Sequence, residues 1–110
     1  MIVPKEVRSY RKPDGSYPFK DWLAGLKDFK GQQIILTRLD RLALGNPGTC
    51  RHVGDGIWEL KIDFGPGYRV YFGYHGDIIV VLLSGGDKGS QNRDIPIAKR
   101  YWADYGRRVS

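Results

Sequence analysis

Three strand patterns lie close together between residues 57 and 83, and they constrain the fold more than any other part of the chain. The first two alternate apolar and polar residues, which is typical of strands with one buried face. The third is apolar at every position, which is typical of a central strand covered on both faces. The sequence therefore predicts a β-sheet built around residues 57–63, 68–74 and 78–83.

The first two of these strands are expected to form a hairpin through residues 64–67. Their apolar faces must lie on the same side of the sheet, because a slip of one residue would expose one of them. This parity places Lys61 and Arg69 together on the other face, either directly opposite each other or one step diagonal. Two like charges so close together favour an anionic ligand on that face.

The length of 110 residues allows a single domain, spanning 1–110, with one hydrophobic core. A formal charge of +6 indicates a basic globular protein with an anionic partner. The one cysteine, Cys50, permits no internal disulfide, which favours a reducing compartment, and we expect it to pack as an apolar residue. The sequence shows no apolar leader and no run of about 20 apolar residues, so we expect a cytoplasmic protein without a membrane span.

Apolar spacing predicts three helices: one from Pro18 through Leu26, one over 32–44 with Arg38 facing outward, and a last one capped by Asp94 with Pro96 in its first turn. Weak strands are expected at 3–11 and 50–54, and a flexible polar loop at 84–90. The order predicts an α+β domain, a twisted antiparallel sheet with an N-terminal αα-hairpin and a C-terminal helix. The helices are expected on one face, with the other face open.

Several motifs together resemble a known family. They are GDGIWELKI at 54–62, GPGYRVYF at 65–72 and LLSGGDKGSQ at 82–91, followed by Asp94, Ile95 and Ala98. Upstream, Trp22-Leu23 and the RLDRL run at 38–42 with Gly45-Asn46 resemble the same family's helical hairpin. Over nearly the whole chain, this set resembles the addiction-module killer proteins, the HigB-like toxins of the RelE/ParE superfamily.

The resemblance implies the toxin of a type II toxin–antitoxin pair, neutralised by an antitoxin that carries a helix-turn-helix domain. Many RelE-like members cleave mRNA in the ribosomal A site, which implies the ribosome and mRNA as partners and inhibition of translation as the result. ParE-like members instead poison DNA gyrase without enzymatic activity, so the superfamily leaves two targets open. A basic nucleic-acid-binding module without toxicity is a third reading of the charge.

RNA cleavage without a metal requires stabilisation of the negative charge that develops on the phosphorus oxygens. Arg69 suits this role best, because its planar guanidinium can hold two phosphate oxygens and stays charged at any working pH. Lys61 would bind the phosphate or assist the leaving group, and Lys88 matches the position where the resemblance implies a catalytic basic residue. The structural alternative is that Arg69 pairs with Glu59 or Asp63 and that both lysines are ordinary solvated side chains.

Four residues are candidates for the acid or base, and the sequence does not choose among Tyr71, Glu59, Asp87 and His52. RelE-type enzymes can place a tyrosine in the last helix, where this chain has residues 91–94 without one. Arg51 and Arg93 are further candidates for RNA binding. Two scattered histidines and one cysteine make no metal-ligand set, and no Walker-type phosphate loop is present, so no metal or small-molecule cofactor is expected.

Overall fold

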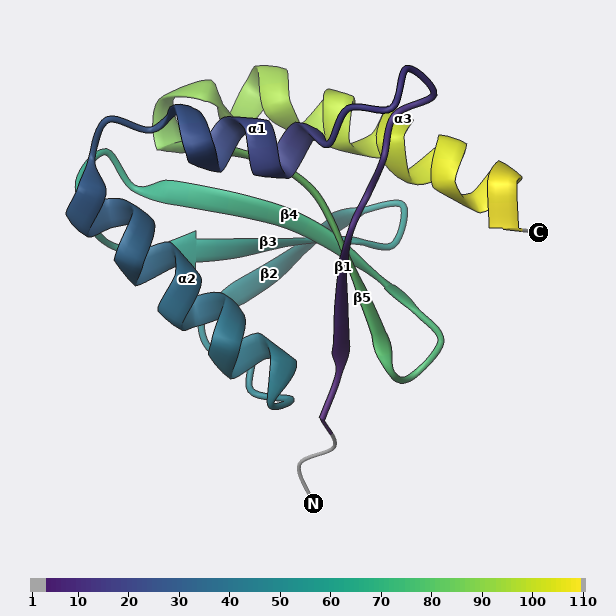
Figure 1. Ribbon diagram of the computed structural model, residues 1–110, viewed down its shortest axis with the longest axis horizontal. Coiled ribbons are helices and arrows are strands. Elements are labelled where there is room, and N and C mark those ends of the chain that lie inside the picture. The colour runs from purple at the N-terminus through teal and green to yellow at the C-terminus, as the bar shows by residue number, and fades with distance from the viewer. Residues whose placement is uncertain (1–3, 110) are drawn as a thin grey trace.

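The computed structural model describes residues 4–109, which form five strands and three α-helices (Figure 1). In chain order these are β1 (Glu6–Ser9), α1 (Pro18–Gly25), α2 (Phe29–Ala43), β2 (Cys50–Gly54), β3 (Ile57–Ile62), β4 (Tyr68–His75), β5 (Ile79–Asp87), a short 3₁₀ turn η1 (Lys88–Ser90) and α3 (Gln91–Val109). The predicted α+β class and the strand pairs at the centre of the sheet are confirmed. Val3, where the first strand was predicted to begin, lies outside the described residues.

The sheet is mixed, with the strand order β1-β5-β4-β3-β2. Strands β2 to β5 are antiparallel neighbours, whereas β1 pairs in parallel with β5, Glu6 lying opposite Ile79. The prediction of a purely antiparallel sheet was therefore wrong. The chain leaves β1 and passes through α1 and α2 before it returns to the sheet, and a crossover of this length permits parallel pairing.

Helices cover both faces of the sheet, which corrects the prediction of an open face. On one side, α1 and α2 pack on a core that includes Phe19, Ile35, Leu60 and Phe72. On the other side, Ala98 and its neighbours on α3 pack on a second core built from Tyr10, Ile57, Tyr71, Val81 and Leu83. In Figure 1, α3 passes behind α1. The fully apolar strand β5 thus contributes to both cores, as its sequence predicts.

Helices α1 and α2 are both present, but in Figure 1 they form an open V rather than a closely packed hairpin. The break between them is also shorter than predicted, because α2 begins at Phe29 rather than Gln32. Asp28 caps α2 by accepting a hydrogen bond from the Gly31 amide (2.9 Å) and also accepts one from the Tyr68 hydroxyl (2.8 Å). Gly31 is required inside the helix, since a Cβ there would lie 2.5 Å from the Asp28 carboxylate.

Asp28→Ala should lower the melting temperature at neutral pH and have little effect in acid. Hydrogen bonds from Gly31 and Tyr68 hold the pKa of Asp28 below its ordinary value. A depressed pKa stabilises the fold above the ordinary pKa of aspartate, and the contribution is lost as pH falls through the folded-state value. Thermal unfolding of both proteins between pH 7 and pH 2 tests this. A difference in melting temperature that is constant with pH would contradict it.

The segment 84–90 is not a flexible loop, because β5 continues through Asp87 and pairs with β4 along its length. Two glycines in this segment allow close packing: a Cβ on Gly85 would lie 2.1 Å from the Trp22 ring, and one on Gly86 would lie 1.9 Å from the Asp94 carboxylate. Asp87, rather than Asp94, is the N-cap, and it caps η1, which leads directly into α3. Since α3 begins at Gln91, Pro96 lies inside the helix and not in its first turn.

Candidate functional site

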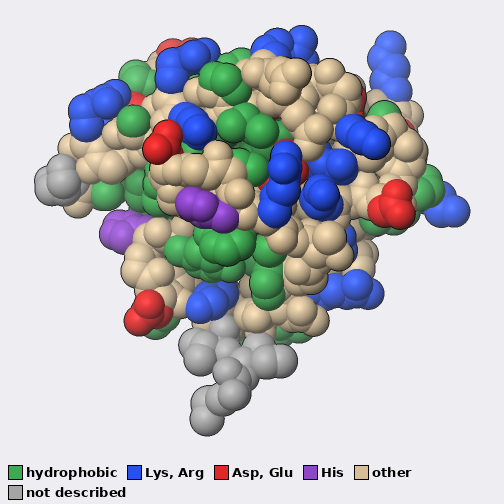
Figure 2. Space-filling model, turned by 180° about the vertical axis from the view of Figure 1, so that it is seen from behind, with side chains coloured by type: hydrophobic (Ala, Val, Ile, Leu, Met, Phe, Trp, Pro, Cys, Tyr) green, Lys and Arg blue, Asp and Glu red, His purple; other side chains and the backbone are tan. Residues whose placement is uncertain are grey.

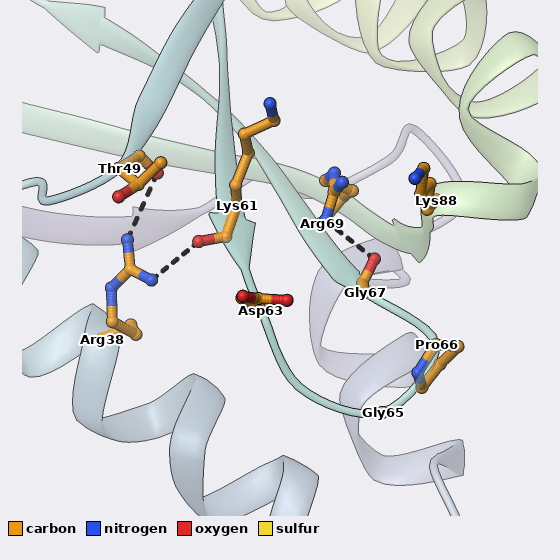
Figure 3. A pocket seen from close by; sticks show the side chains of 9 residues that line it. All are labelled: Arg38, Thr49, Lys61, Asp63, Gly65, Pro66, Gly67, Arg69 and Lys88. Carbon is orange, nitrogen blue, oxygen red and sulfur yellow. Dashed lines mark hydrogen bonds between the residues drawn. The ribbon is translucent and has the colours of Figure 1, made fainter.

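An open cavity of about 570 Å³ lies where β3 ends and β4 begins, beside the turn that joins them. It is bounded by the end of β3, the start of β4, the middle of α2 and the first residue of η1 (Figure 3). The residues lining it are Arg38, Thr49, Lys61, Asp63, Gly65, Pro66, Gly67, Arg69 and Lys88. Four of these side chains are cationic and one is a carboxylate, so the cavity is suited to an anionic ligand.

The three predicted basic residues meet in this cavity. Lys61 and Arg69 lie on the same face, as the parity of the hairpin predicts, and of the two arrangements left open they adopt the directly opposite one. Lys88 reaches the same cavity because its backbone amide donates to the Gly67 carbonyl (2.9 Å), which fixes the start of η1 against the turn. In Figure 3 the three side chains stand side by side, each from a different element.

Arg69 is only 8% exposed, and backbone carbonyls hold its guanidinium in place. Its Nη1 donates to the carbonyls of Gly67 (2.9 Å) and Tyr68 (3.1 Å). Its Nε lies 3.7 Å from Oε1 of Glu59 and has no hydrogen-bond partner among the described residues. Arg69 therefore lines the cavity in a fixed orientation instead of moving freely in solvent.

Arg38 is a cavity residue that the sequence prediction missed by placing it on the outer face of α2. Its Nη1 donates to the Lys61 carbonyl (2.7 Å), and its Nη2 donates to the carbonyls of Pro47 (3.2 Å) and Thr49 (3.3 Å). Burial lowers the pKa of this guanidinium, but an arginine stays charged at any working pH. Arg38 thus adds positive charge to the cavity. It also links α2 to the segment just before β2 and to the last part of β3. The position of Arg38 in the helix could not predict this location, because its hydrogen-bond partners are backbone carbonyls far away along the chain.

Glu59 lies behind the cationic pair, fully buried on the face that α3 covers. Its carboxylate accepts hydrogen bonds from Arg51 Nε (2.8 Å), the Tyr71 hydroxyl (3.0 Å) and Gln91 Nε2 (2.9 Å). Burial by itself raises the pKa of a carboxyl, but these three hydrogen bonds outweigh it and hold the pKa of Glu59 below its ordinary value. Glu59 is therefore an ionised, fully bonded carboxylate that does not line the cavity.

The other acid or base candidates also lie outside the cavity lining. Tyr71 is fully buried, and burial together with the Glu59 charge raises the pKa of its hydroxyl well above the ordinary value. The Asp87 carboxylate accepts from the backbone amides of Gly89 and Ser90. His52 contacts the edge of the Trp58 ring, with the ring centroids 5.2 Å apart, on the opposite face of the sheet from Lys61.

Asp63 is the one carboxylate among the residues that line the cavity, and its side chain is exposed. It follows β3 directly, so the strand alternation that brings Lys61 to this face brings Asp63 to it as well. In Figure 3 it lies between Arg38 and the β3–β4 turn. The sequence indicated Asp63 only as an alternative to Glu59 for pairing with Arg69, and Glu59 is the carboxylate that lies close to Arg69 (Nε to Oε1, 3.7 Å).

The two predicted RNA-binding arginines lie outside the cavity lining. Arg51 is bonded to Glu59 and has half of its side chain exposed, and Arg93 lies in the first turn of α3 with 76% of its side chain exposed. Figure 2 shows Lys and Arg side chains gathered right of the centre on the back of the molecule, with few acidic side chains among them. Other Lys and Arg side chains are scattered over the rest of this face.

Two comparisons relate this chain to known proteins. Residues 21–103 match the family described as Phage derived protein Gp49-like (DUF891). An uncharacterized protein of Haemophilus influenzae is 47% identical over 81 residues, which is 74% of this chain and 82% of that protein. The family match includes every residue that lines the cavity. No helix within residues 4–109 is long and apolar enough to cross a membrane.

Proposed function

Since this chain belongs to the phage-derived Gp49-like family, a toxin-like family related to RelE- and HigB-type toxins, we propose that it is the toxin of a type II toxin–antitoxin pair. The activity we propose is cleavage of mRNA on the ribosome. A toxin-like family implies an antitoxin partner in general, and the proposed partner carries a helix-turn-helix domain. The observation that carries the catalytic part is the meeting of Lys61, Arg69 and Lys88 in one cavity. The mixed sheet with helices on both faces is the framework we propose to be RelE/HigB-like.

The proposed reaction is attack of a ribose 2′-oxygen on the adjacent phosphorus, with departure of the 5′-oxygen of the next nucleotide. The products are a 2′,3′-cyclic phosphate and a 5′-hydroxyl. Arg69 and Lys61 stabilise the additional negative charge on the phosphoryl oxygens, and the Arg69 guanidinium is already fixed by backbone carbonyls before that charge develops. The Lys88 ammonium supplies the proton to the leaving 5′-oxygen.

The proposed base is Asp63, which takes the proton of the 2′-hydroxyl. It is the carboxylate exposed to the cavity, whereas both oxygens of Glu59 already accept hydrogen bonds and that residue is fully buried. A general base must lie within reach of the proton it removes, which favours a side chain that lines the cavity. The ribosome would orient the mRNA, so that cleavage of free RNA is slow.

The purified protein, added to a translating extract, is expected to cut mRNA within translated codons, and primer extension maps the cuts. The same mRNA without ribosomes serves as the control and should remain largely intact. Intact mRNA in both samples would contradict the endonuclease proposal. DNA breaks and loss of supercoiling with translation unaffected would instead identify gyrase as the target.

Asp63→Asn should change binding and cleavage in opposite directions. Removing a negative charge from a cationic cavity strengthens the binding of an anion, whereas loss of the base slows cleavage by about 10²–10⁴-fold. Binding is measured with a short mRNA analogue whose 2′-hydroxyl at the cut site is methylated, and the rate under single-turnover conditions on the ribosome. Tighter binding with an unchanged or faster rate would exclude Asp63 as the base.

A further inference from the structure

Behind the cavity lies a row of three residues that the cleavage chemistry above does not use. Across the sheet, Arg51, Glu59 and Tyr71 are direct register partners on three neighbouring strands. The next row toward the cavity contains Lys61 opposite Arg69. Gln91, at the start of α3, donates to Glu59 from above the sheet. Three hydrogen-bond donors therefore hold Glu59 in the row next to Lys61 and Arg69.

The hydrogen-bond donors of Arg69 can be accounted for one by one. A guanidinium has five N–H groups, one on Nε and two on each terminal nitrogen. The two on Nη1 are used by the carbonyls of Gly67 and Tyr68, and Nε lies 3.7 Å from the Glu59 carboxylate. Nη2 donates no hydrogen bond to any of the described residues. Arg69 lines the cavity. Two N–H groups remain for a ligand.

We propose that Glu59 is a positioning residue, which acts through Arg69 by holding its Nε side so that Nη2 faces the bound phosphate. A fixed carboxylate suits this role: Glu59 is fully buried, accepts from Arg51, Tyr71 and Gln91, and has Oε1 3.7 Å from Arg69 Nε. The inference rests on the phosphate-binding role proposed for the cavity but not on the cleavage step.

The sign of the effect on anion affinity separates positioning from simple charge. Glu59 is negative, so its removal should strengthen anion binding if it acts only through its charge. If it positions Arg69, its removal frees the Nε side of the guanidinium, which is then held only through Nη1 by Gly67 and Tyr68, and binding weakens. Asp63→Asn is the matched control, since it removes one negative charge from the cavity wall without touching the Glu59 hydrogen bonds, and it should strengthen binding.

The experiment is a titration of the purified protein with inorganic phosphate, followed by ¹⁵N NMR of the arginine side chains without ribosomes or RNA. In the wild type we expect the Arg69 Nε–H resonance to be sharp and to shift on phosphate addition. In Glu59→Gln we expect it to broaden, with phosphate affinity reduced about tenfold, the cost of losing one charge-assisted hydrogen bond between Arg69 Nη2 and the phosphate. Unchanged or tighter phosphate binding by Glu59→Gln would overturn the inference.

Gln91→Leu serves as a second variant in case Glu59→Gln does not fold. It removes one donor to Glu59 without changing any charge, so the fold keeps its buried ions paired. We expect a smaller loss of phosphate affinity in the same direction, with the same broadening of the Arg69 resonance. Affinity equal to wild type would count against positioning. A wild-type protein that shows no Arg69-dependent phosphate binding would remove the proposed cavity function itself, a result distinct from failure of the variants.

Discussion

Arg69→Ala is expected to reduce ribosome-dependent mRNA cleavage by about 10²–10³-fold, the cost of removing one fixed donor to a developing oxyanion. The geometry explains the size of this effect. Arg69 is held by the carbonyls of Gly67 and Tyr68, so it needs no reorganisation when the charge develops. Lysine cannot replace it fully, because an ammonium lacks the planar fork that leaves two N–H groups for the phosphate.

Single-turnover cleavage on stalled ribosomes measures this effect, with circular dichroism to establish that the variants are folded. Arg69→Lys should recover only part of the lost rate. Arg100→Ala is the matched control, since it removes the same charge from an exposed position on α3 and should cleave like the wild type. Cleavage by Arg69→Ala within about threefold of the control would contradict the assigned role.

Gly85→Ala is expected to cause a large loss of stability although it adds a single methyl group. The added Cβ would lie 2.1 Å from one carbon of the Trp22 ring and 2.4 Å from a second. That ring cannot move away easily, because it packs against Phe19 (centroids 5.9 Å apart) and Tyr68 (6.0 Å). Overpacking of this kind costs about 1–3 kcal/mol, which corresponds to a fall in melting temperature on the order of 10 °C.

Gly106→Ala is the matched control for the glycine substitution. Gly106 lies in α3, and a Cβ there would have no atom within 4 Å outside its own helix. Alanine should stabilise this position by about 0.5–1 kcal/mol, because glycine has the greater conformational entropy to lose. Thermal unfolding should therefore move the two variants in opposite directions. Equal melting temperatures would show that Trp22 can give way.

The sequence was sufficient to predict the cationic pair because that prediction depends only on local alternation. The apolar faces of β3 and β4 must lie on one side of the sheet, and this places Lys61 and Arg69 together on the other face. That they are directly opposite rather than diagonal is shown by the register of the structure. Glu59 obeys the same alternation but was expected to be exposed. Its burial depends on Arg51 and Gln91, which approach from another strand and from α3. Alternation predicts which face a side chain is on, but not what covers that face.

The other errors have a similar cause. Glycine is typical of turns, so the run at 84–90 favoured a loop, whereas Gly85 and Gly86 are needed inside β5 for contact with Trp22 and Asp94. Arg38 occupies a helical position that is typical of a solvent-facing residue, but its partners are carbonyls 9 to 23 residues away along the chain. Both features depend on contacts that no local pattern contains.

One carbonyl oxygen connects the parts of the cavity. The Gly67 carbonyl accepts from both the Arg69 guanidinium and the Lys88 amide, and thereby joins the hairpin turn to the beginning of the last helical segment. A partial detachment of that segment would therefore remove a ligand-facing lysine and loosen the arginine in the same event. Proteins undergo such local openings at lower free energy than global unfolding. Such an opening disrupts the cavity while most of the backbone remains folded.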